Sequence, residues 1–220
     1  MKAIWKFRFL ALLIAVFVGG ISFANLAAEF RRPAPLPLPS EGSNSPASAQ
    51  VSSAALVATI APFRSDLAAD QALGLASQAL KSEIKGQAEK ESTVQDAVRS
   101  VVKIAPHDSR MWLALALVQA RDNPVDPLIA ESLKMSYLTS PNQAELIPIR
   151  LDAVTTNNAL SDSDLGELAR SDVRAILTRL HEQRQTLVND YARASEIGKK
   201  FLEQSVAAID PGFVDKLRKK

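Results

Sequence analysis

The chain of 220 residues contains no cysteine and two histidines. The lack of cysteine excludes disulfide bridges, thiolate metal sites and cysteine nucleophiles. His107 lies in a Pro-His-Asp turn, and the sequence after His181 lacks the second histidine that a zinc-protease helix needs four residues on. Glycine-rich phosphate loops and Gly-x-Ser-x-Gly elbows are also missing from the sequence. We therefore expect a protein that is not an enzyme, with no catalytic residue, cofactor or metal.

Aromatic residues are scarce, at 5% of the chain, and the formal net charge is only +2. Few aromatics beside abundant alanine and leucine favour an all-α fold over a β-sandwich. The small net charge does not indicate binding to nucleic acid, and we expect no nucleic-acid partner.

The N-terminus has the order typical of a membrane-targeting segment. Lys2, Lys6 and Arg8 precede an apolar run that continues from Phe9 to Phe30. This run is long enough to cross about 30 Å of hydrocarbon, and the cations would keep its first end in the cytoplasm. We expect a single-pass inner (plasma) membrane protein, anchored through residues 9–30, with its C-terminal domain outside the cytoplasm.

Cleavage is the alternative for the same segment. Ser22-Phe23-Ala24 offers small residues at the two positions that a signal peptidase reads, so the mature chain would begin at Asn25. A cleaved chain would be a soluble periplasmic or secreted protein.

The composition divides the chain into four parts. We expect a signal anchor or signal peptide over 1–30, a disordered Pro/Ser/Ala-rich linker over 31–55, a helical domain over 56–214 and a basic tail over 215–220. Proline at every second position in 33–39 excludes a helix there and favours an extended polyproline conformation.

Helical periodicity runs through the predicted domain. It predicts five helices, Asp66–Lys81, Ser92–Ile104, Arg110–Ala120, Pro127–Leu138 and Gln143–Val154. Two longer C-terminal helices follow, the first opening with a capping box of Asp164 and Glu167 and the second covering Gln183–Ile209. Within the second, the small residues Ala194, Gly198 and Ser205 would let a neighbouring helix approach closely.

Two helix-ending prolines, Pro106 and Pro141, lie about 35 residues apart, and each precedes a new helix. Trp112 and Leu115 follow the first of them at helical spacing. In these residues the chain resembles tetratricopeptide repeats over roughly residues 67–154. The resemblance implies antiparallel helix pairs in a right-handed stack whose concave face binds proteins. It departs from the family at Val94, where a small residue is usual; an irregular helical bundle is the alternative.

Candidate partner-binding residues are of two kinds. Trp112 and Tyr137 would line an apolar groove for a protein or peptide, whereas Arg170 and Arg174 would contact an acidic polymer. We expect a non-catalytic scaffold of the bacterial cell envelope that binds other envelope proteins, accessory to assembly or export of an envelope polymer. The alternative function is that of a cleaved periplasmic protein that binds a ligand or polysaccharide.

Overall fold

The computed structural model describes residues 2–32, 38, 48–61, 64–82 and 88–218. Within these ranges all regular structure is helical, which confirms the predicted fold class. The α-helices are α1 (Lys2–Arg31), α2 (Ser48–Ile60), α3 (Ser65–Lys81), α4 (Ala88–Ile104), α5 (Ser109–Asp122), α6 (Leu128–Thr139), α7 (Ile147–Thr156), α8 (Ser163–Thr178), α9 (Arg184–Arg193), α10 (Glu196–Ala207) and α11 (Val214–Arg218). Short 3₁₀ turns, η1 (Asn158–Ser161), η2 (His181–Gln183) and η3 (Pro211–Phe213), join the later helices.

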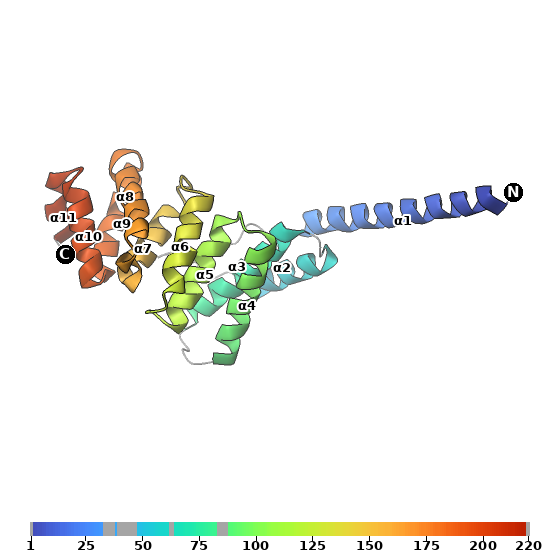
Figure 1. The fold of residues 1–220 in the computed structure, drawn as a ribbon, viewed down its shortest axis with the longest axis horizontal. Helices are drawn as coiled ribbons and strands as arrows, with labels where there is room; N and C mark the ends of the chain where they lie inside the picture. The colour runs from blue at the N-terminus through green and yellow to red at the C-terminus, as the bar shows by residue number, and fades with distance from the viewer. Residues whose placement is uncertain (1, 33–37, 39–47, 62–63, 83–87, 219–220) are drawn as a thin grey trace.

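The helices form an elongated body from which α1 projects as a single rod (Figure 1). Consecutive helices from α2 to α6 pack side by side, and α7 to α11 continue the body toward the C-terminus at its far end. One apolar core runs through α3 to α11, and its fully buried residues include Leu73, Leu113, Leu133, Leu151 and Ile176. The body is therefore a continuous packed unit.

Helix α1 contains the predicted membrane-targeting segment. Its stretch Trp5–Arg31 is long and apolar enough to cross a membrane, and its most apolar part is not buried by the rest of the protein. Phe17 and Phe23 are 65% and 73% exposed. The structure thus confirms a helix that could serve as a transmembrane span or as a signal sequence.

Helix α2 lies partly where we predicted a linker. Ser48–Ala55 is helical, so the prediction of a disordered segment up to residue 55 is wrong for these residues. Val51, Ala54 and Val57 are buried, which stabilises a helix whose Ser/Ala composition suggested a flexible chain. The predicted polyproline segment lies outside the described residues except for Leu38, which is buried in the core.

The C-terminal part differs from the prediction in its helix boundaries. The expected helix Gln183–Ile209 is two helices, α9 and α10, because Ser195 leaves the helical path to cap α10. Its hydroxyl accepts from the Gly198 amide at 3.1 Å, and its own amide donates to the Thr155 carbonyl at 3.0 Å. The predicted tail also begins too early, because α11 continues to Arg218 and buries Leu217.

Helices α4, α7 and α8 also begin at residues other than those predicted. Helix α4 begins at Ala88, four residues before the predicted Ser92. Asp162, not Asp164, caps α8, and its carboxylate accepts from the amides of Asp164 and Leu165 at 3.0 Å each. Helix α7 begins at Ile147 rather than Gln143, with Pro148 in its first turn, where proline costs no hydrogen bond.

Candidate functional site

The two aromatic residues predicted to bind a partner do not form a surface together. Trp112 is half-buried, and its indole N–H donates to the Pro106 carbonyl at 2.8 Å. Tyr137 is 1% exposed and belongs to the core. The hydrogen bond of Trp112 therefore stabilises the turn before α5, and Tyr137 is not accessible to a partner.

Tyr137 instead belongs to a buried polar network that sequence reasoning missed. The fully buried Arg150 of α7 donates to the Ser136 hydroxyl at 3.0 Å and to the carbonyls of Ser136 and Ser140 at 2.9 Å each. Its guanidinium lies 4.9 Å from the centre of the Tyr137 ring. Burial raises the pKa of Asp172 to about 7, against the opposing effects of the Tyr137 hydroxyl and the Arg150 charge. The network joins α6, α7 and α8.

The two predicted cations lie one turn apart on α8. Arg170 forms an ion pair with Glu167, and its guanidinium lies 5.6 Å from the centre of the Phe201 ring. Arg174 is exposed to solvent. Glu167 therefore neutralises part of the charge of Arg170. Neither arginine lines the groove described next.

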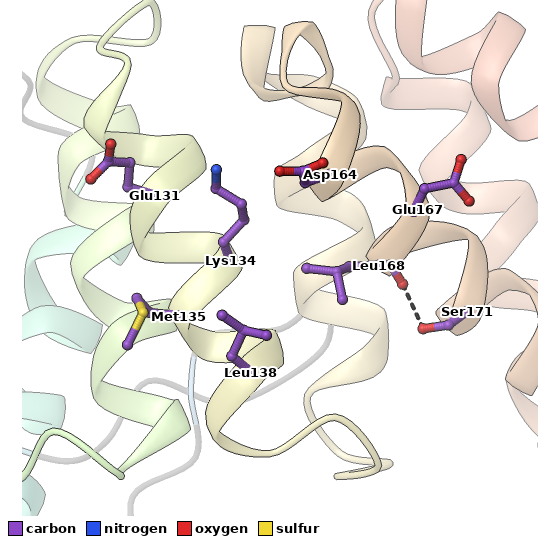
Figure 2. Close-up of a pocket in the computed structure, with 8 residues that line it drawn as sticks. All are labelled: Glu131, Lys134, Met135, Leu138, Asp164, Glu167, Leu168 and Ser171. Atoms are coloured by element: carbon purple, nitrogen blue, oxygen red, sulfur yellow. Dashed lines mark hydrogen bonds between the residues drawn. The ribbon is translucent and has the colours of Figure 1, made fainter.

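A groove of about 650 Å³ lies between α6 and α8. Its apolar floor consists of Met135, Leu138 and Leu168, and Leu138 is 65% exposed. Figure 2 shows Lys134 and Asp164 on opposite sides of the groove, with Leu138 and Leu168 facing each other further along it. The remaining lining residues are Glu131, Glu167 and Ser171.

The rim of this groove is acidic on balance. Lys134 donates to the Asp162 carboxylate at 2.7 Å, and this bond lowers the pKa of Asp162. Within the described part of the chain, Glu131 and Asp164 form no ion pair. An apolar floor beneath two unpaired carboxylates suits a segment that carries both apolar and basic side chains.

A second arrangement joins α1 to the body. Arg32 donates to Asp70 at 2.7 Å and to Asp66 at 3.1 Å, and Arg64 donates to Glu29 at 2.7 Å. The hydrogen bond from Arg64 lowers the pKa of Asp66. These five residues, which we call the junction clamp, connect the end of α1 to the start of α3. The residues paired across the junction are more than 30 positions apart in the sequence, so patterns within one segment did not predict these ion pairs.

The described residues contain no group of three or more histidine, aspartate or glutamate side chains placed to hold a metal ion. No protein-family model, curated protein or solved structure matches the chain. The functional argument therefore depends on the groove, on α1 and on the junction clamp.

Proposed function

We propose that this chain is a non-catalytic, membrane-anchored interaction module of the bacterial cell envelope. In this proposal α1 stays in the inner membrane, the body lies outside the cytoplasm, and the groove between α6 and α8 binds another envelope protein. Lys2, Lys6 and Arg8 support the orientation, because cations are enriched on the cytoplasmic side of a span. The observation that carries the proposal is the exposed apolar floor of the groove, with Leu138 65% exposed.

The groove favours a protein segment over an acidic polymer. Covering Met135, Leu138 and Leu168 removes apolar surface from water, which stabilises a complex with an amphipathic helix or strand. Glu131 and Asp164 would attract lysine or arginine in that segment and repel an anionic polysaccharide. An accessory role in envelope polymer assembly or export would then act through the protein partner.

The relation to tetratricopeptide repeats stays part of this proposal. Consecutive packing of α3 to α6 supports it, since repeat proteins stack neighbouring helices in this manner. Such stacks offer extended concave surfaces to their partners.

The test compares two exposed apolar residues, one in the last turn of α6 and one in the turn before that helix. Leu138→Asp places a carboxylate in the groove, whereas Val125→Asp alters a residue that is 70% exposed in the turn before α6. Tagged full-length chains are cross-linked in membranes, gently solubilised and captured, and the bound proteins are quantified by mass spectrometry. We expect an envelope protein that the wild type and Val125→Asp capture equally and that Leu138→Asp captures about tenfold less. Equal capture by all three chains would contradict the groove as the binding site.

A further inference from the structure

The length of α1 determines where the far edge of a membrane meets the protein, provided that α1 spans it as proposed. An α-helix rises about 1.5 Å per residue, so about 20 residues cross a hydrocarbon core of about 30 Å. Counted from Phe9, the first residue after Arg8, the far edge falls near Ala28. Ala28 is also where α1 enters the body, because it is buried with Val57 of α2 and with Ala61, the residue after α2. The C-terminal end of α2, which lies alongside the end of α1 (Figure 1), is therefore at the level of the membrane interface.

The composition of α2 suits this level. Its thirteen residues include no charged side chain. Val51, Ala54 and Val57 are buried, and the opposite face exposes Ser52, Leu56 and Thr59. A helix that faces water usually carries charges on its exposed side. The Thr59 hydroxyl donates to the Ala55 carbonyl at 2.9 Å, so it needs no water as an acceptor.

Exposed apolar side chains of α1 and α2 lie close to the level of Ala28 and Val57. Leu56 is 52% exposed, and Leu26 and Phe30 of α1 are 57% and 84% exposed. Exposing this apolar surface to water costs free energy. Burying it at the boundary between headgroups and acyl chains removes that cost. The packing of Ala28 against Val57 keeps α1 and α2 in this relation, and the junction clamp attaches α1 to α3.

We propose that the C-terminal half of α2 contacts the interface of the far leaflet through Leu56, at the level of Leu26 and Phe30 of α1. The body would then have two contacts with the membrane, the span and α2, and would be held close against the lipid surface. Because α2 lacks charge, this contact does not require anionic lipid and is insensitive to salt. The inference rests on the proposed anchoring by α1.

The absence of cysteine allows each site to be labelled alone. Full-length Leu56→Cys is labelled with an environment-sensitive fluorophore and reconstituted in phosphatidylcholine vesicles, with and without phosphatidylglycerol. Phe17→Cys reports the middle of α1. Ile197→Cys, which is 55% exposed on α10, is the matched control on the body. Quenching by spin-labelled lipid and by aqueous iodide is measured at each site, and circular dichroism checks that each variant is folded.

We expect lipid quenching at residue 17 and, from the probe nearest the headgroups, at residue 56, equally in both vesicle types. Residue 197 should respond only to iodide. If residue 56 behaves like residue 197 while residue 17 is in lipid, the placement of α2 is overturned and the anchor stands. If residue 17 also responds only to iodide, the anchor itself is overturned, and the placement of α2 with it.

Discussion

At the scale of single residues, Gly198 is a position where a larger side chain has no room. A Cβ atom added there would lie 2.1 Å from the Thr155 carbonyl oxygen, a backbone atom that cannot move alone. The same oxygen accepts from the Ser195 amide at 3.0 Å and from the Ser195 hydroxyl at 2.9 Å. The end of α7 and the start of α10 therefore touch through their backbones.

We predict that Gly198→Ala destabilises the protein and that Gly166→Ala, in α8, does not. The first change forces α10 away from α7 and should cost about 1–3 kcal/mol, as overpacking does. No atom lies within 4 Å of a Cβ at Gly166, so alanine should stabilise that helix by about 0.5–1 kcal/mol. Urea unfolding of the full-length chain in detergent, followed by circular dichroism, gives both values. Similar effects at the two sites would contradict the close approach at Gly198.

The sequence predicted part of this contact. Gly198 was expected to allow close approach of a helix, and the structure confirms it. The break at Ser195 was not predicted, because its bonds reach Thr155, far away in the chain. Arg150 shows the same limit, since arginine is usually exposed and only the fold supplies its buried acceptors.

At the scale of helices, the sequence predicted the helices whose ends are marked by nearby residues, such as a capping side chain. Helices α3 and α5 lie within two residues of their expected bounds, and Asp108 caps α5 by accepting from the Arg110 amide at 3.0 Å. Helix α2 was not predicted in full, because burial against neighbouring helices, rather than composition, stabilises its first half. The junction clamp was also unpredictable, since its partners come from separate helices.

We predict that the junction clamp holds α1 in one direction relative to the body. Arg32→Gln removes the charge that pairs with Asp70, which is 4% exposed at its side chain and would keep only Arg110, at 3.9 Å. Losing the two Arg32 hydrogen bonds leaves this buried carboxylate under-satisfied at a cost of about 1–3 kcal/mol, which favours release of α1 from the body. Arg31→Gln is the matched control, because Arg31 is exposed and forms no ion pair in the described part of the chain.

The measurement is the distance distribution between spin labels on Phe23→Cys of α1 and Ile104→Cys of α4, which are both exposed. The chain that keeps both arginines and the Arg31→Gln variant should each give one narrow distribution of distances. The Arg32→Gln variant should give a broad distribution. A narrow distribution in Arg32→Gln would show that apolar packing around Ala28 holds the junction without these ion pairs.

At the scale of the whole molecule, the proposed membrane contact and the groove lie in different parts of the body. Figure 1 shows α1 and α2 at one end, with α6 and α8 further toward the C-terminal end. With α1 held by the junction clamp as predicted, a partner in the groove would be held away from the bilayer. The groove could not be predicted from sequence, because α6 and α8 are not consecutive helices.

This arrangement depends on α1 remaining attached to the body. In the proposed anchor, α1 continues past Ser22-Phe23-Ala24 to Arg31 and packs into the body at Ala28, so we predict that the chain is not cleaved there. Intact mass spectrometry should find the full 23.8 kDa chain, and carbonate washing should leave it in the membrane pellet. Ser22→Phe, at an exposed position, blocks peptidase recognition without altering the packing of Ala28 and should change neither result.

A wild-type chain that begins at Asn25 and is soluble, together with a Ser22→Phe chain retained in the pellet, would instead establish a cleaved periplasmic protein. Such a protein would keep Glu29 and Arg32 of the junction clamp, and its groove would no longer be held at a fixed place above the membrane.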